Sequence, residues 1–283
     1  MCATCGCGAD EAVITLAGHH HPHDHPHDHD HPHDHDHPHD HDHPNDHVHT
    51  ETITLEQKVL AKNDLVAEEN RRRLADRDIL ALNMTSSPGA GKTTLLERTI
   101  RDLGGQRPIA VIEGDQETLL DANRIRDAGA RAVQINTGAG CHLDADMVRR
   151  ALDTLDPEPG SLLFIENVGN LVCPAMFDLG ENSKVVVISV TEGADKPLKY
   201  PHMFAAAGLV VVNKTDLLPY VDFDLEACAG YARSLNPGVN ILPLSATTGA
   251  GVADWYAWVG LLANRPQTGQ MSLHSVDKTN SPE

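Results

Sequence analysis

Residues 79–94 read ILALNMTSSPGAGKTT. The first part, Ile79–Met84, is a nearly continuous apolar run, which is typical of a strand buried on both faces. The second part, Ser86–Thr93, is rich in small residues and ends in Gly-Lys-Thr, and the residues after it predict a helix. A glycine-rich loop between a strand and a helix is the context that a phosphate-binding loop requires.

The chemistry of this loop follows from its residue types. Glycines let backbone N–H groups approach phosphate oxygens, and the start of the following helix adds a favourable dipole. Lys92 is expected to reach the β- and γ-phosphates, and the Thr93 hydroxyl to bind Mg²⁺. Ser86 stands where the usual pattern has glycine, and it fits if its φ stays negative. The predicted nucleotide-binding residues of the loop are Gly89, Ala90, Gly91, Lys92, Thr93 and Thr94.

Apolar runs alternate with helical segments along the rest of the chain, which predicts an α/β fold: a doubly wound, mostly parallel sheet of the P-loop NTPase, G-domain-like kind. A capping box at Thr54–Gln57 predicts the start of a preceding helix that ends at Leu74. One face of this helix is expected to carry Leu55, Val59, Val66, Glu69 and Arg73. The predicted strands are Ile79–Met84, Ile109–Ile112, Ala132–Ile135, Leu162–Ile165, Val185–Val190, Leu209–Val212 and Asn240–Leu242.

The segment Asn213-Lys214-Thr215-Asp216 follows a predicted strand and favours guanine over adenine. The Asp216 carboxylate can accept hydrogen bonds from guanine N1–H and the 2-amino group, and adenine offers neither donor. Asn213 is expected to hold the loop and the base edge, with the Lys214 stem against the ring. Ser245 and Ala246 are expected to supply a backbone N–H to the guanine carbonyl. The alternative is an ordinary polar turn at a strand end.

Two further strand ends are acidic, at Asp115 and Glu166. Ligands of open parallel sheets lie beyond the carboxyl ends of the strands. We therefore expect both carboxylates to hold Mg²⁺ directly or through water, and one of them to orient the attacking water. With Lys92 they form the predicted catalytic set, although the sequence leaves open which carboxylate has which role. Gly169 is expected to let the second loop move with the γ-phosphate.

Cys141, His142 and Cys173 are candidate ligands for Zn²⁺ or Ni²⁺. Three protein ligands leave the shell incomplete, and water or a two-fold-related subunit would complete it. The loop that carries Cys173 begins at Glu166, so loss of the γ-phosphate is expected to change metal affinity. The alternative is that both cysteines are small buried hydrophobes and His142 is a core histidine.

The N-terminus is rich in potential metal ligands. Cys2, Cys5 and Cys7 can converge on one ion, and sixteen of the nineteen histidines lie between His19 and His49. We expect residues 1–17 to form a Cys-rich metal-binding head and residues 18–50 a disordered metal store, because prolines recur and few residues are apolar. The predicted storage ligands are His19, His20, His21, His23, His25, His27, His29, His31, His33, His35, His37, His39, His41, His43, His47 and His49.

Composition excludes several classes of protein. A net charge of −19 argues against a nucleic-acid-binding surface. The sequence shows no membrane-length apolar run and no secretory signal, so we expect a cytoplasmic protein. Six cysteines in 283 residues favour metal binding over a disulfide framework. We expect a GTPase domain with its N-terminal helix over residues 51–265 and a flexible tail over 266–283.

Together these motifs resemble the hydrogenase nickel-incorporation GTPases, the HypB family of the SIMIBI-class P-loop GTPases. The matching segments are residues 2–8, 86–94, 113–116, 137–144, 166–174 and 213–216. The Ser86 departure is usual in that family.

The resemblance implies a slow GTPase that forms a GTP-dependent homodimer and delivers nickel to the large-subunit precursor of nickel–iron hydrogenase. It implies that Cys141, His142 and Cys173 bind zinc or nickel at the dimer interface, and that a zinc-and-nickel accessory metallochaperone is a partner. Three alternatives stay open: a urease-type nickel-insertion GTPase, a non-catalytic nickel store on a nucleotide-binding fold, and a P-loop kinase.

Overall fold

The computed structural model describes residues 13–16, 46–115, 120–138 and 140–264. Their centre is an eight-stranded sheet in the order β1-β4-β3-β5-β2-β6-β7-β8. All neighbouring pairs are parallel except β1 with β4. The strands are β1 (Val13–Leu16), β2 (Leu80–Ser86), β3 (Ile109–Asp115), β4 (Arg131–Asn136), β5 (Leu162–Glu166), β6 (Ser183–Ser189), β7 (Leu209–Asn213) and β8 (Asn240–Pro243).

The seven parallel strands confirm the predicted doubly wound sheet, and every predicted strand is present. All seven residues of β2 are buried, as expected of a strand covered on both faces. The strand β1 was not predicted; it is an edge strand of four residues within the Cys-rich head and pairs antiparallel with β4. So short a run next to low-complexity sequence has too few residues for a period-two pattern to stand out.

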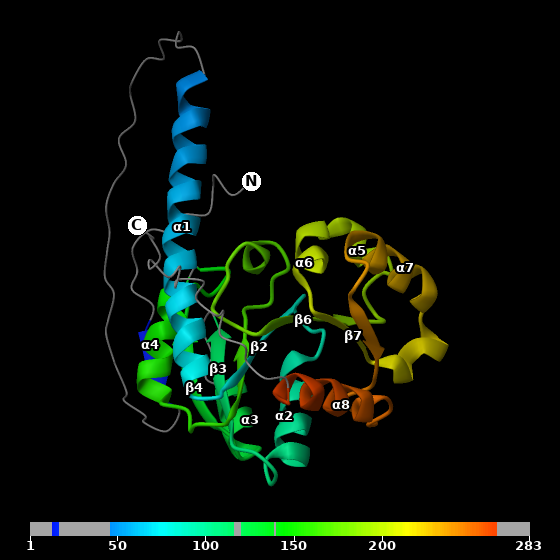
Figure 1. Cartoon of the computed structure of the whole chain (residues 1–283). Helices are drawn as coiled ribbons and strands as arrows, with labels where there is room; N and C mark the ends of the chain where they lie inside the picture. The colour runs from blue at the N-terminus through cyan, green and yellow to red at the C-terminus, as the bar shows by residue number, and fades with distance from the viewer. Residues whose placement is uncertain (1–12, 17–45, 116–119, 139, 265–283) are drawn as a thin grey trace, which may run out of the picture.

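Helices cover both faces of the sheet (Figure 1). They are α1 (Asp46–Asp76), α2 (Lys92–Leu103), α3 (Leu120–Asp127), α4 (Ala145–Leu155), α5 (Lys196–Lys199), α6 (Pro201–Ala206), α7 (Leu225–Leu235) and α8 (Val252–Ala263), with 3₁₀ turns η1 (Cys173–Ala175) and η2 (Thr215–Tyr220). One face packs against α2, α3 and α8 around Trp255, and the other against α1 and α4 and against α6 and α7. Alternate residues of β2 enter opposite cores, so the sheet itself separates the two layers.

The first helix differs from its prediction in two ways. It begins at Asp46 rather than near Thr54, inside the segment for which disorder was predicted. No proline occurs between residues 45 and 87, so no helix-breaking residue separates Asp46 from Thr54. The storage candidates His47 and His49 therefore lie in α1.

The face on which α1 docks is also different. Its buried residues are Asn63, Ala67, Asn70 and Leu74, whereas Val59 is 50% exposed. Asn70 Nδ2 donates to the carbonyls of Ala145 (2.8 Å) and Leu179 (3.1 Å), and Asn63 Oδ1 accepts from Ala145 N–H (2.9 Å). Asparagine amides satisfy backbone groups at this contact, which a search for apolar periodicity does not detect. Among the described residues, no helix is both long and apolar enough to cross a membrane.

Candidate functional site

The phosphate loop lies where β2 ends and α2 begins, at the centre of the sheet. Gly91 has φ +95°, and a Cβ there would stand 2.5 Å from Asn213 Nδ2. Glycine is therefore required at position 91 both by the backbone conformation and by the close approach of β7. Ser86 is not among the described residues with positive φ, as its place in the loop requires.

Two side chains of the loop already have partners. Lys92 Nζ donates to Ser86 Oγ at 2.7 Å, which explains a serine at a position that usually holds glycine. The Thr93 hydroxyl donates to Glu166 Oε1 at 2.8 Å. Both Lys92 and Thr93 are buried. The predicted phosphate and Mg²⁺ residues therefore face one another across the carboxyl ends of β2 and β5.

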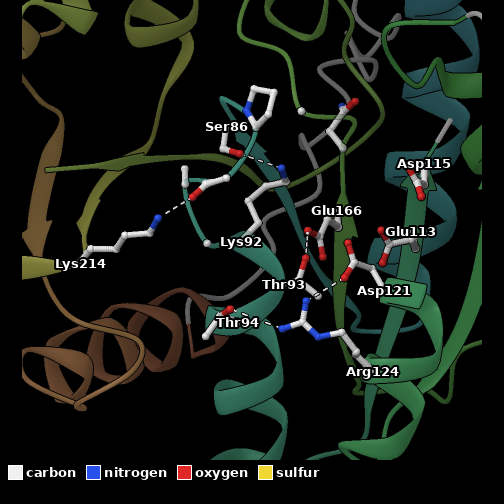
Figure 2. Close-up of a pocket in the computed structure, with 17 residues that line it drawn as sticks. Ser86, Lys92, Thr93, Thr94, Glu113, Asp115, Asp121, Arg124, Glu166 and Lys214 are labelled. Atoms are coloured by element: carbon white, nitrogen blue, oxygen red, sulfur yellow. Dashed lines mark hydrogen bonds and ion pairs between the residues drawn. The ribbon is translucent and has the colours of Figure 1, made fainter. Parts of the chain in front are cut away.

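A pocket of about 420 Å³ opens above this loop (Figure 2). The phosphate loop and the carboxyl ends of β3 and β5 form its walls. Of the predicted residues, those that line it are Gly89, Ala90, Gly91, Lys92, Thr93, Thr94, Asp115, Glu166, Gly169 and Lys214. Gly169 packs closely on this loop, because a Cβ there would lie 3.2 Å from Pro88 Cγ.

The carboxyl groups of Glu113, Asp121 and Glu166 gather beside Thr93 (Figure 2). Burial, reinforced by the charge of Glu166, raises the pKa of Glu113 to about 9. Burial also raises the pKa of Glu166, against the opposing effects of Lys92 and the Thr93 hydrogen bond. The buried oxygens Glu113 Oε2 and Glu166 Oε2 accept no hydrogen bond from the described residues. A hard divalent cation such as Mg²⁺ prefers oxygen ligands of this kind, so the residues fit the predicted ion.

Sequence reasoning missed two residues of this pocket, Asp121 and Arg124 on α3. The Arg124 guanidinium bonds Asp121 Oδ1 (2.8 Å) and Glu97 Oε2 (3.0 Å) and reaches Thr94 Oγ1 (3.5 Å). It brings a positive charge to a pocket with several carboxylates. No motif marks either residue, because α3 is a short polar helix whose place beside α2 is set by strand order. Glu113, noted only as part of an acidic strand end, is the third addition.

The loop after β7 holds the phosphate loop in place. Asn213 Nδ2 donates to Ala90 O (2.9 Å), and Lys214 Nζ donates to Gly89 O (2.7 Å). Asn213 Oδ1 accepts from Ala246 N–H at 3.0 Å, so one side chain joins the phosphate loop, β7 and the loop after β8. Asn213 therefore contacts two neighbouring loops, as expected of a residue that holds a loop in place, and its predicted contact with the base edge stays a prediction.

Ser245 N–H donates to Ala250 O (2.8 Å) and Ala246 N–H to Asn213 Oδ1, so this tight turn after β8 also positions Asn213. The predicted contact of Ser245 and Ala246 with the guanine carbonyl stays a prediction. Asp216 is exposed at the start of η2 and does not line the phosphate pocket, and its predicted contact with guanine stays a prediction.

The structure brings together Cys141, His142 and Cys173, whose ligand atoms all lie within 4.8 Å of one another. The Cys141 and Cys173 sulfurs are 3.0 Å apart, and Cys141 Sγ is 3.6 Å from His142 Nδ1. The His142 ring stacks on Phe177 with centroids 4.0 Å apart. Burial lowers the pKa of His142, which favours the neutral imidazole that binds metal. We call this set the thiolate–imidazole triad.

The other predicted metal ligands cannot be placed in the same way. Cys2, Cys5 and Cys7 and the storage histidines from His19 to His43 lie outside the described residues, as does the predicted tail over 266–283.

Fold and pocket together define a P-loop nucleotide-binding protein with a candidate soft-metal site near its phosphate pocket. The family model described as CobW/HypB/UreG, nucleotide-binding domain, matches residues 80–243. The chain belongs to this family, and its relatives place it in the HypB branch.

The hydrogenase maturation factor HypB of Azotobacter vinelandii is 61% identical over 207 residues, which cover 73% of this chain and 68% of the relative. The crystal structure of HypB from Helicobacter pylori in complex with nickel superposes with a TM-score of 0.69 at 36% identity, covering 75% of this chain and 99% of that one. The structure of HypB from Archaeoglobus fulgidus gives a TM-score of 0.67 at 41% identity, covering 72% and 100%.

Proposed function

We propose that this protein is a GTP-hydrolysing metallochaperone that inserts nickel into the large subunit of a nickel–iron hydrogenase during maturation. The observation that carries the proposal is the segment 166–173. It begins at a carboxylate bonded to the phosphate-loop threonine and ends at a cysteine of the triad. The HypB relatives named as hydrogenase maturation factors, and the nickel complex of the H. pylori relative, support the choice of metal and pathway.

In the hydrolysis step, Lys92 leaves Ser86 Oγ and contacts the β- and γ-phosphates. Thr93 and Glu166, with Asp115, are the residues that would hold Mg²⁺. When bound, this ion neutralises charge on the β- and γ-phosphate oxygens. Glu166 or Asp115 orients the attacking water, and Arg124 adds positive charge at the pocket wall. Asp216 selects guanine.

The cargo site is the triad. Two thiolates and a neutral imidazole suit nickel and also zinc, and the same residues of a second subunit would complete the shell in a GTP-dependent homodimer. Exposed apolar side chains flank Cys173, with Val172 48% and Met176 52% exposed, as expected beside a protein contact. We infer that a zinc-and-nickel accessory protein and the hydrogenase precursor are the donor and acceptor of the metal.

The N-terminal cysteines and the histidine tract supply a reserve of the same metal. Imidazole must be neutral to bind, so stored metal is released as pH falls through about 6.5. Deletion of residues 19–43 should lower the number of Ni²⁺ ions bound per chain and leave the triad's ion in place. Unchanged stoichiometry would remove the storage role.

The test of the main proposal compares GTP and ATP turnover with hydrogenase maturation in cells. Lys92→Ala should abolish GTP hydrolysis and maturation together, with Lys199→Ala on exposed α5 as the control. Asp216→Ala should lower the preference for GTP over ATP by several orders of magnitude, by loss of the paired donors. Maturation that persists in Lys92→Ala would instead favour a nickel store on a nucleotide-binding fold.

A further inference from the structure

Two asparagines of the 166–173 segment bind the loop that carries the other two triad ligands. Asn167 is buried, lines the phosphate pocket and accepts at Oδ1 from Leu143 N–H (3.3 Å) and Val168 N–H (3.0 Å). Its Nδ2 donates to Asn83 Oδ1 of β2 at 3.4 Å. The pocket wall therefore already contacts the residue next to His142.

Asn170 makes the second connection, closer to the sulfur atoms. Its Nδ2 donates to the Cys141 carbonyl at 3.1 Å, and its Oδ1 accepts from Val172 N–H at 2.9 Å. One amide thus joins the backbone of Cys141 to the backbone residue immediately before Cys173. The planar amide keeps its donor and acceptor in a constant relative geometry.

A third residue of the path, Gly169, packs on the phosphate loop. A side-chain carbon at this position would lie 3.2–3.4 Å from three atoms of Pro88, so the segment has almost no free space on that side. A displacement of the segment by phosphate contacts therefore passes along the chain toward Asn170 and Cys173. Of the two residues between them, Leu171 is buried and Val172 N–H is bonded to Asn170 Oδ1, so the shift reaches the turn at Cys173.

We propose that Asn170 is the positioning residue that transmits nucleotide state to the triad, an inference that rests on the nucleotide-controlled metal site proposed above. Its Nδ2 bond carries a shift of the segment to Cys141, and its Oδ1 bond carries the shift to the turn that begins at Cys173. Both ligand loops then respond to one event at the phosphates. Neither Asn170 atom is a metal ligand in this scheme.

The test is Asn170→Asp in the full-length chain. A carboxylate retains an acceptor for Val172 N–H but has no donor for the Cys141 carbonyl. The matched control is Asn236→Asp, which removes donors to Ala207 O (2.8 Å) and Ala205 O (3.2 Å) beside α6. Nickel affinity is measured against a competing chelator. The signal is the part of the thiolate-to-nickel absorption that is lost in a Cys141→Ser, Cys173→Ser double variant, because Cys2, Cys5 and Cys7 can contribute the rest. Each protein is titrated with GDP and with a non-hydrolysable GTP analogue.

The deciding quantity compares the nickel dissociation constant measured with GDP and the one measured with the GTP analogue. It is the larger of these two constants divided by the smaller. An effect of the added charge, or a general loosening of the site, cancels in the ratio where it is equal in both nucleotide states, and Asn170→Ala, which adds no charge, checks this. We expect Asn170→Asp to reduce the wild-type ratio about 2- to 10-fold, the factor that one hydrogen bond supplies. The effect of nickel on the preference for the GTP analogue over GDP should fall by the same factor.

If the wild-type ratio differs from one and Asn170→Asp does not reduce it, the role of Asn170 is overturned. The proposed coupling between nucleotide and metal then remains intact. A wild-type ratio of one removes the coupling itself. Asn170→Ala, which lacks both amide bonds, repeats the test if the aspartate variant unfolds at lower temperature, and its unreduced ratio would equally overturn the inference.

Discussion

Glu113 should destabilise the nucleotide-free protein, and replacing it with glutamine should stabilise that state. The side chain is 3% exposed, and its pKa is raised from 4.5 to about 9 by burial and by Glu166. Between these pH values the folded protein holds a proton that the unfolded chain has released. The free energy of unfolding therefore falls as pH rises from 4.5 to 9, by up to ~1.4 kcal/mol per pH unit.

The magnitude at pH 7 follows from the same shift. The interval between 4.5 and pH 7 corresponds to ~3 kcal/mol at 1.36 kcal/mol per unit. Glu113→Gln has nearly the same shape and carries no charge, and Glu113 Oε2 accepts no hydrogen bond from the described residues. The variant should therefore recover most of this energy, which raises the melting temperature by about 6–10 °C in a domain of this size.

The assay is thermal and urea unfolding between pH 5 and 8.5, with EDTA and without nucleotide, because bound Mg²⁺ would favour the ionised carboxylate. Wild type should lose stability across this range more steeply than Glu113→Gln, and the two should converge near pH 5. Glu158→Gln, at an exposed carboxylate, is the control. Parallel pH profiles for wild type and Glu113→Gln, or a lower melting temperature in the variant at pH 7, would refute the reasoning.

Thr93→Ala removes the hydroxyl that bonds Glu166 and should weaken Mg²⁺–nucleotide binding by about 10- to 100-fold, the worth of a hydrogen bond to a charged group. Thr93→Ser should restore it in equilibrium dialysis, and equal affinities with alanine and serine would contradict the assignment. Gly91→Ala forces an L-residue to φ +95° and displaces Asn213, so the free energy of unfolding should fall by ~2–4 kcal/mol. A urea midpoint unchanged from wild type would show that the loop tolerates a side chain. Asn70→Ala leaves the buried carbonyls of Ala145 and Leu179 without this donor, so the free energy of unfolding in the same assay should fall by ~2–4 kcal/mol. Glu69→Ala, on the exposed side of α1, is the control. A cost as small as that of Glu69→Ala would mean that α1 is held by other contacts.

The features that sequence reasoning found are those encoded by neighbouring residues. Apolar runs such as Leu162–Ile165 and Val185–Val190 have the composition of strands buried on both faces, and the glycines of the phosphate loop mark the strand-to-helix junction. Local backbone preferences and periodicity are enough to locate such elements. Because parallel strands share their direction, the ends of all predicted strands were also expected at the same edge of the sheet.

The features that were missed depend on strand order. Placing β5 between β2 and β3 brings Glu166 beside both Thr93 and Glu113. Burial there raises the pKa of both carboxyl groups, and the charge of Glu166 raises that of Glu113 further. The docking face of α1 was misassigned because its contacts are asparagine-to-backbone bonds, whose partners Ala145 and Leu179 lie 75 and 109 residues away.

Residue types alone predict the phosphate loop and the candidate soft-metal ligands of this chain, because each motif is short and its chemistry is local. The meeting of Cys141 with Cys173, 32 residues apart, belongs to the folded protein. So do the bridge made by Asn170 and the charge of Arg124 at the pocket wall. Side-chain convergence depends on how strands β4 and β5 and their loops pack, and this packing is a property of the whole core that no single segment encodes.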